Sequence, residues 1–316
     1  MFCAHNRVVS AEAFEVPARL TRGLHAEVAY RYLAGSGDPV LLVHGVGADQ
    51  ATWQLVPRDL QAAGRAVLTI DLLGHGDSGA GGTDFGLSAH AALVRDLLDH
   101  LAIARVHLVG HSVGGGVTMQ FASESPERVS SLTLISSDGL GREVSPSLRA
   151  ALLPGSATSI GVLTHPWVTK PMRQIIRFLE QRGFSNRDFS ERTVDALERL
   201  QDGGRRTAFL ETLRGVVGLN GQRLSVLDHL EVLDPRRLLI IWGEQDPMVP
   251  VDHGRRIHGL LPGSRLVVIP GAGHEPYIDE PQVIVREVLA HTAPHLARWA
   301  PQAHLRAATG VTVRPL

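Results

Sequence analysis

Six short runs of apolar residues, each continuous rather than alternating, constrain the fold of this 316-residue chain most strongly. A strand that is covered on one face alternates apolar and polar residues, whereas a strand covered on both faces is apolar throughout. Residues 27–32 alternate, which predicts a half-buried strand, and residues 35–39 are then expected to form a turn. Helix-like stretches separate several of the runs, so we predict an α/β fold in which helices flank a parallel sheet. The runs are Val40–Val43, Ala66–Ile70, Val106–Val109, Leu132–Ile135, Leu238–Trp242 and Leu266–Ile269.

A long interruption divides this pattern. Between about residues 140 and 230 the regular alternation stops and helix-like sequences dominate. We predict that residues 140–230 form a helical cap, or lid, over the carboxyl ends of the strands, and that residues 1–139 and 231–300 form the core. Residues 301–316 show no clear hydrophobic period and are expected to form a flexible C-terminal tail.

Composition narrows the classes of function. The formal net charge is −1, so no overall field favours nucleic acid or an anionic membrane as a partner. The single cysteine, Cys3, excludes an internal disulfide framework. The chain lacks both the apolar core of a secretory signal and the ~18 consecutive apolar residues of a membrane-spanning helix. We therefore expect a cytoplasmic protein with no membrane span.

A sharp turn from strand to helix is indicated where the third apolar run ends. The sequence from Gly110 to Gly114 has the pattern Gly-x-Ser-x-Gly, with Ser112 at its centre. In such a turn the serine takes a strained backbone conformation that pushes its hydroxyl outward. Glycine fits on either side because a larger side chain would collide with the neighbouring strand or helix. Ser112 is therefore the candidate nucleophile.

A serine hydroxyl is a weak nucleophile at neutral pH, so it needs a general base, which in turn needs a carboxylate partner. His274 lies in a Gly- and Pro-rich loop directly after the last apolar run, where parallel sheets place catalytic groups. Asp246 follows the fifth run and precedes Pro247, which favours an extended loop. We assign Asp246 as the acid and retain Asp138, which follows the fourth run, as the alternative acid. Glu244 is a weaker rival because it lies closer to the strand end.

Acyl transfer also requires donors for the negative oxygen that develops in the transition state. In a strand–turn–helix site of this type, one donor is the backbone N–H of the residue after the nucleophile, here Val113. The other comes from the loop after an early strand. That loop is His44-Gly45-Val46-Gly47, directly after the first run, so Val46 is the second expected donor.

Together these segments resemble the α/β-hydrolase superfamily over about residues 25–292. The resemblance implies the α/β-hydrolase fold, with a mostly parallel eight-stranded sheet flanked by helices and a helical cap insertion. It also implies a catalytic triad in the chain order serine, acid, histidine, which Ser112, Asp246 and His274 match. His75 and Asp77 are implied to be structural. The matching segments are His44-Gly45-x-Gly47, Asp71–Ser78, Gly110–Gly115, Trp242-Gly243-x-x-Asp246-x-x-Val249-Pro250 and Gly273-His274-x-Pro276.

We predict a serine hydrolase that cleaves a small-molecule carboxylic ester, thioester or lactone through an acyl-enzyme. No cofactor is expected, and no metal site, because His5, His25 and His90 lack ligand spacing. The sequence does not specify an oligomeric state. The apolar and aromatic residues of the cap, such as Trp167 and Phe178, are interpreted more readily as its own core than as a substrate lining.

Two alternatives remain open. Carbon–carbon bond hydrolases of ring-cleavage products, which act on dienoic diketones, resemble this chain and use serine. They often carry tryptophan after the histidine, where this chain has Glu275. Related dehalogenases and epoxide hydrolases use a carboxylate at the position of Ser112 and are disfavoured. A non-catalytic binding protein is the second alternative, although all three triad positions are occupied.

Overall fold

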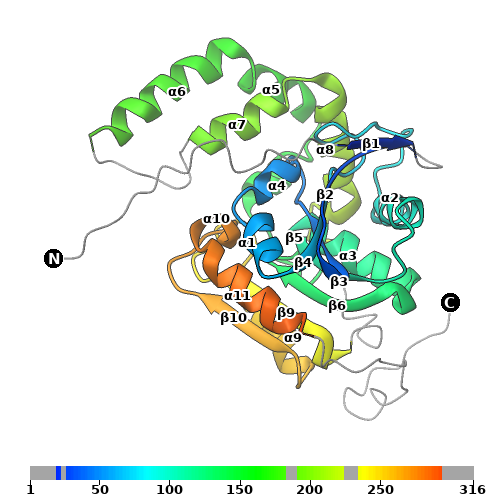
Figure 1. The fold of residues 1–316 in the computed structure, drawn as a ribbon. Coiled ribbons are helices and arrows are strands. Elements are labelled where there is room, and N and C mark those ends of the chain that lie inside the picture. The colour runs from blue at the N-terminus through cyan, green and yellow to red at the C-terminus, as the bar shows by residue number, and fades with distance from the viewer. Residues whose placement is uncertain (1–18, 23–25, 183–190, 224–233, 294–316) are drawn as a thin grey trace.

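A computed structural model describes residues 19–22, 26–182, 191–223 and 234–293 (Figure 1). Cys3, His5, His25 and the predicted tail at 301–316 lie outside the described residues. Within the described ranges, no helix combines the length and the hydropathy needed to cross a membrane.

One eight-stranded sheet forms the centre of the molecule, in the order β1-β2-β4-β3-β5-β6-β9-β10. β1 pairs antiparallel with β2, and β2 pairs antiparallel with β4, whereas all the other neighbours are parallel. The predicted mostly parallel sheet of eight strands is confirmed. The strands are β1 (Arg19–Arg22), β2 (Glu27–Leu33), β3 (Ser36–Val43), β4 (Arg65–Ile70), β5 (Val106–His111), β6 (Val129–Ile135), β9 (Leu238–Gly243) and β10 (Arg265–Ile269).

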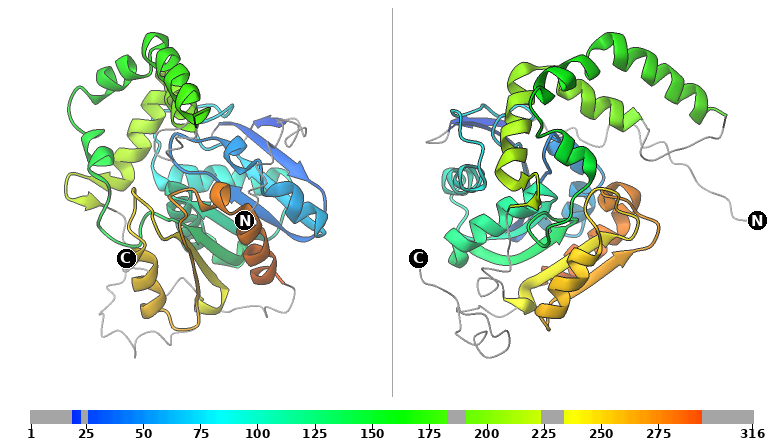
Figure 2. Two further views of the ribbon diagram at one scale, coloured as in Figure 1. Left: turned by 90° about the vertical axis from the view of Figure 1, so that its left-hand side faces the viewer. Right: turned by 180° about the vertical axis from the view of Figure 1, so that it is seen from behind.

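Helices cover both faces of this sheet (Figures 1 and 2). In β3, Leu41 and Val43 pack in a core with residues of α2 and α3, whereas Val40 and Leu42 pack in a second core with residues of α1 and α11. Both sides of the strand are therefore buried, which explains why its sequence is continuously apolar. The helices are α1 (Pro57–Ala62), α2 (Leu87–His100), α3 (Val113–Glu124), α9 (Asp252–Leu260), α10 (Pro276–Asp279) and α11 (Pro281–His291), with short 3-10 helices η2 (Gln50–Trp53), η3 (Pro126–Arg128) and η5 (Pro235–Arg237).

A mainly helical segment joins β6 to β9, and we call its described part, residues 140–182 and 191–223, the helical insertion. Its helix α8 is fixed to the core, because Thr212 Oγ1 lies 3.2 Å from His90 Nε2. α5 and α6 lie at the outer edge of the molecule, away from the sheet (Figure 1). The elements are α4 (Pro146–Ala150), α5 (Ser156–Leu163), α6 (Pro166–Glu180), α7 (Glu191–Arg199), α8 (Gly203–Val216) and a hairpin of β7 (Val217–Gly218) and β8 (Gly221–Gln222).

The turn expected at residues 35–39 is wrong, because β3 already begins at Ser36. Ser36 pairs with Arg65 of β4, and the register shifts before Val40. A Cβ atom on Gly35 would lie 2.2 Å from the backbone of Arg65. The glycine therefore permits a close backbone approach at the start of an irregular strand.

Candidate active site

The turn at Ser112 lies between the end of β5 and the start of α3. Ser112 has φ 52° and ψ −121°, a conformation that non-glycine residues rarely adopt and that is costly to hold. Its N–H donates to the carbonyl of Ile135 at 3.1 Å, and its carbonyl accepts from Gly115 at 2.9 Å and Asp138 at 3.1 Å. The strained turn is therefore held by hydrogen bonds to β6, to the loop after β6 and to α3.

The loop after β3 lies directly against this turn. A Cβ atom on Gly45 would lie 3.1 Å from Ser112 Cβ, and one on Gly114 would lie 2.4 Å from the carbonyl oxygen of His44. Both glycines are thus required by close packing. The loop carries Val46 past the serine, and Val113 begins α3, where backbone N–H groups have no partner within the helix.

The imidazole of His44 fixes the conformation of the same loop. Its Nδ1–H donates to the carbonyl of Gly45 at 2.8 Å, and its Nε2 accepts from Leu72 N–H at 3.0 Å. Burial is the main reason that the pKa of His44 falls to about 4. The ring is therefore neutral at neutral pH, as this pair of hydrogen bonds requires.

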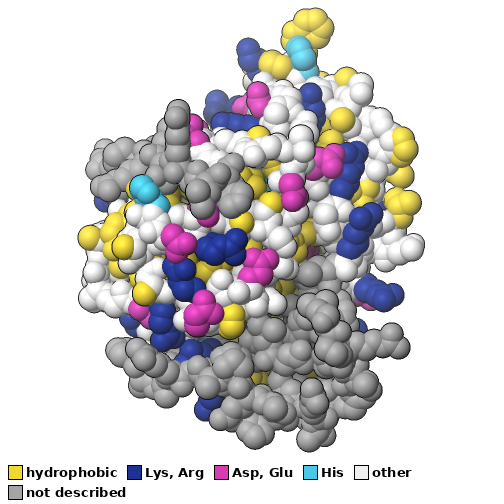
Figure 3. Space-filling view, turned by 90° about the vertical axis from the view of Figure 1, so that its right-hand side faces the viewer, with side chains coloured by type: hydrophobic (Ala, Val, Ile, Leu, Met, Phe, Trp, Pro, Cys, Tyr) yellow, Lys and Arg dark blue, Asp and Glu magenta, His cyan; other side chains and the backbone are white. Residues whose placement is uncertain are grey.

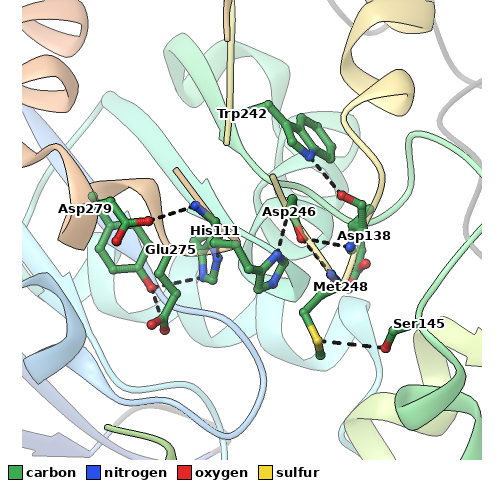
Figure 4. Close-up of polar contacts among 12 residues, drawn as sticks. His111, Asp138, Ser145, Trp242, Asp246, Met248, Glu275 and Asp279 are labelled. Atoms are coloured by element: carbon green, nitrogen blue, oxygen red, sulfur yellow. Dashed lines mark hydrogen bonds and ion pairs between the residues drawn. The ribbon is translucent and has the colours of Figure 1, made fainter. Parts of the chain in front are cut away.

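Asp246 and His274 come from the loops after β9 and β10, and the structure joins them directly (Figure 4). His274 Nδ1 lies 2.8 Å from Asp246 Oδ2. The other carboxylate oxygen, Oδ1, accepts from the N–H groups of Met248 at 2.8 Å and Val249 at 3.0 Å. The side chain of Asp246 is fully buried, so the carboxylate both shapes its own loop and orients the imidazole.

The charges around His274 favour its protonated form. Burial alone would lower its pKa, but the hydrogen bond and charge of Asp246, together with the charges of Asp138 and Glu275, raise the pKa above the ordinary value. An imidazole in this environment is suited to accept a proton from a hydroxyl group.

Asp138 does not take the position of the acid partner. Its Oδ1 accepts from Gln222 Nε2 at 3.2 Å, and Gln222 Oε1 accepts from the N–H of Gly139. Asp138 is 3% exposed. Burial is the main reason that the pKa of Asp138 rises to about 6. The charge of His274 lowers this pKa in part, and the charge of Asp246 raises it further. Gln222 thus links β8 of the helical insertion to the loop that follows β6.

His111 is a site residue that our sequence analysis did not assign. Its Nε2–H donates to the carbonyl of His274 at 2.9 Å, and its Nδ1 lies 3.3 Å from the hydroxyl of Tyr277 (Figure 4). The same hydroxyl lies 3.3 Å from Glu275 Oε1. Because His111 directly precedes Ser112, these contacts bring the serine turn and the histidine loop to the same sheet edge. The signal in the sequence was the position of His111 inside the Gly-x-Ser-x-Gly pattern.

The segment that contains His75 and Asp77 makes structural contacts. His75 Nδ1–H donates to the carbonyl of Leu73 at 2.8 Å. The N–H of Asp77 donates to Asp71 Oδ2 at 3.0 Å, and the same carboxylate accepts from the side chain of Gln50 at 3.0 Å. Among the described residues, no three His, Cys, Asp or Glu side chains are grouped so as to hold a metal ion.

Comparison with known proteins identifies the family. A model of the alpha/beta hydrolase family matches residues 40–287. An uncharacterized protein of Mycobacterium tuberculosis is 38% identical over 252 residues, which cover 79% of this chain and 73% of that protein. The 2-hydroxy-6-oxo-6-phenylhexa-2,4-dienoate hydrolase of Burkholderia cepacia is 30% identical over 254 residues, 76% of this chain and 82% of the hydrolase. A meta-cleavage product hydrolase from Pseudomonas fluorescens has the same fold, with a TM-score of 0.67 at 21% identity over 86% of this chain and 96% of the hydrolase. The chain therefore belongs to the alpha/beta hydrolase family.

Proposed function

We propose that this protein is a serine hydrolase that cleaves a carboxylic ester, thioester or lactone through an acyl-enzyme. The observation that carries the proposal is the hydrogen-bonded pair of Asp246 and His274, tied through His111 to the strained turn at Ser112. A nucleophile on such a turn, a base and a group that orients the base are the parts that acyl transfer needs.

In this mechanism His274 Nε2 removes the proton of Ser112 as Oγ attacks the carbonyl carbon of the substrate. Asp246 keeps Nδ1 protonated through the 2.8 Å hydrogen bond and stabilises the imidazolium that forms. The N–H groups of Val46 and Val113 hold the developing oxyanion. His274 then gives its proton to the leaving group, and water attacks the acyl-enzyme with His274 again as the base.

The helical insertion supplies an apolar environment beside these groups. Val46 and Val113 pack in one cluster with residues of the insertion, among them Leu213 and Phe209 of α8. The ring of Phe209 lies against Gly47, where a Cβ atom would be 3.1 Å from it. We infer that residues 140–230 act as a cap and that the part of the substrate nearest the oxyanion donors is apolar.

A Ser112→Ala variant tests the assignment. We expect it to remain folded and to lose turnover of p-nitrophenyl esters of increasing acyl length, together with labelling by a fluorophosphonate. Ser137→Ala is a matched control, because this buried serine also follows a strand, β6, but its hydroxyl donates to the carbonyl of Asp138. Undiminished turnover by Ser112→Ala would reject the proposal. Failure of the wild-type protein to label would favour a binding protein instead.

Hydrolysis of a carbon–carbon bond beside a carbonyl is the second candidate, on the same triad. The Burkholderia cepacia relative, named as a hydrolase of a dienoate that carries a 6-oxo group, favours it. Glu275 argues against carbon–carbon bond hydrolysis. The carboxylate of Glu275 adds negative charge beside His274, where an anionic dienoate would have to bind. Comparison of kcat/KM for a chromophoric dienoate with that for simple esters distinguishes the two reactions.

A further inference from the structure

Large apolar side chains are exposed mainly on one part of the helical insertion. Seven of the ten exposed large hydrophobic residues in the described part of the chain lie between residues 162 and 179, on α5 and α6. Trp167 is 85% exposed and Phe178 is 49% exposed. The seven are Val162, Leu163, Trp167, Val168, Ile175, Phe178 and Leu179.

Four exposed apolar residues of α6 form a stripe along the helix. Residues 167, 171, 175 and 178 are Trp, Pro, Ile and Phe, and their spacing of four, four and three places them on one face. The other face packs inward, because Thr169 and Ile176 are buried. A contiguous apolar patch on a folded surface typically marks an interaction site.

Cations accompany the stripe. Lys170 is exposed between its first two members, and the guanidinium of Arg182 stacks 3.8 Å over the ring of Phe178. The acids of α7 bind arginines of α6: Asp195 and Glu198 both bind Arg173 at 2.8 Å, and Glu191 binds Arg173 and Arg177. Beside the stripe, the described charged side chains are Lys170 and Arg182, so among the described residues this face is apolar and basic.

This combination favours a lipid surface over a second copy of the chain. A two-fold dimer through this face would place Lys170 and Arg182 of both copies, four cations in all, in one interface. A membrane with anionic headgroups complements both the apolar stripe and the cations. Figure 3 shows hydrophobic side chains, with Lys or Arg and some Asp or Glu beside them, at the end of the molecule where Figure 1 places α5 and α6.

We propose that the outer face of α6 docks on a lipid surface that carries anionic headgroups. Trp167, Ile175 and Phe178 enter the boundary between headgroups and acyl chains, and Lys170 and Arg182 contact the headgroups. α6 has 15 residues and lies along the surface rather than across it. The proposal rests on this face alone and is independent of the proposed chemistry at Ser112.

Vesicle sedimentation tests the proposal. The full chain is mixed with vesicles of phosphatidylcholine and phosphatidylglycerol, or of phosphatidylcholine alone, at low and high salt. We expect binding to the anionic vesicles that weakens with salt. The Trp167→Ser/Phe178→Ser double variant should bind about tenfold or more weakly, and Lys170→Glu should also bind more weakly. Leu219→Ser is the matched control, because Leu219 is 66% exposed but lies on the turn between β7 and β8.

Three results would overturn the inference. One is absence of wild-type binding to either kind of vesicle, and another is equal binding by the wild type and the folded double variant. The third is a dimer in solution that the double variant abolishes, which would assign the face to a second copy. Thermal unfolding of each variant confirms that it is folded, and ester turnover is measured separately, so that failure of the catalytic proposal remains distinguishable.

Discussion

Replacing Asp138 with asparagine should stabilise the protein at pH 8 and have much less effect at pH 4. Burial raises the pKa of Asp138 from 3.8 to about 6. Between these values the folded state binds more protons than the unfolded state, so stability falls as the pH rises. A shift of about two units at about 1.4 kcal/mol per unit amounts to about 3 kcal/mol above pH 6. Asparagine removes this cost and keeps an oxygen that accepts from Gln222.

Chemical unfolding at pH 4 and pH 8 measures this difference. The gain from Asp138→Asn should be about 2 kcal/mol larger at pH 8, because little of the cost is present at pH 4. Buried histidines with lowered pKa values also titrate in acid, but they do so in both proteins and cancel in the difference. Asp252→Asn is the control, because its side chain is 78% exposed.

Catalysis gives an independent measurement of the same variant. The charge of Asp138 contributes to the raised pKa of His274, so the acid limb of the kcat/KM profile should move to lower pH in Asp138→Asn. A merely structural effect would change the height of the profile without moving it. A gain in stability that is equal at both pH values, with an unmoved profile, would refute the reasoning.

Three further predictions concern the serine turn, the acid and the close glycine contacts. Asp246→Asn should lower kcat about 10³–10⁴-fold, because asparagine no longer holds the imidazole of His274 in the correct tautomer. Ester turnover measures this loss, and a loss below tenfold would contradict the role assigned to Asp246. Ser112→Gly should be about 1 kcal/mol more stable than Ser112→Ala in thermal unfolding. Glycine adopts φ 52° without strain, and its larger loss of chain entropy on folding offsets part of that gain. Equal stabilities of the two variants would argue against backbone strain at Ser112. Gly114→Ala should destabilise by more than about 2 kcal/mol, because its Cβ would meet the His44 carbonyl at 2.4 Å. Gly259→Ala in α9, where a Cβ meets nothing within 4 Å, should instead stabilise the protein by about 0.5–1 kcal/mol. If denaturant unfolding found Gly114→Ala more stable than Gly259→Ala, the packing argument would be disproved.

The sequence was most informative where burial alone decides the pattern. β3 could be predicted because Leu41 and Leu42 face opposite cores and both faces are covered by helices. The start of β3 at Ser36 could not, because it depends on pairing with Arg65 some thirty residues away. The short strand β1 (Arg19–Arg22) was missed for the same reason: it forms only by pairing with β2.

In the candidate site, too, some residues could be predicted from the sequence and others could not. Ser112, Asp246 and His274 each follow an apolar run, so a parallel sheet brings all three to one edge and local patterns suffice to nominate them. The choice between Asp246 and Asp138 needed the structure, because both follow a strand. Asp246 accepts a hydrogen bond from His274, whereas Asp138 accepts one from Gln222 of the helical insertion.

The two sides of the helical insertion are held by different kinds of interaction. Its inner side is fixed by buried polar contacts, from Thr212 to His90 and from Gln222 to Asp138, and an unpaired buried group left by breaking either would cost about 1–3 kcal/mol. α6 and α7 are joined by ion pairs of Arg173 with partly exposed carboxylates, which contribute at most about 1 kcal/mol each, and Ile176 of α6 and Val194 of α7 are also buried. Because the apolar stripe of α6 is already exposed, docking on a surface requires none of these contacts to break. Docking through α6 and catalysis at Ser112 thus place separate demands on the same insertion.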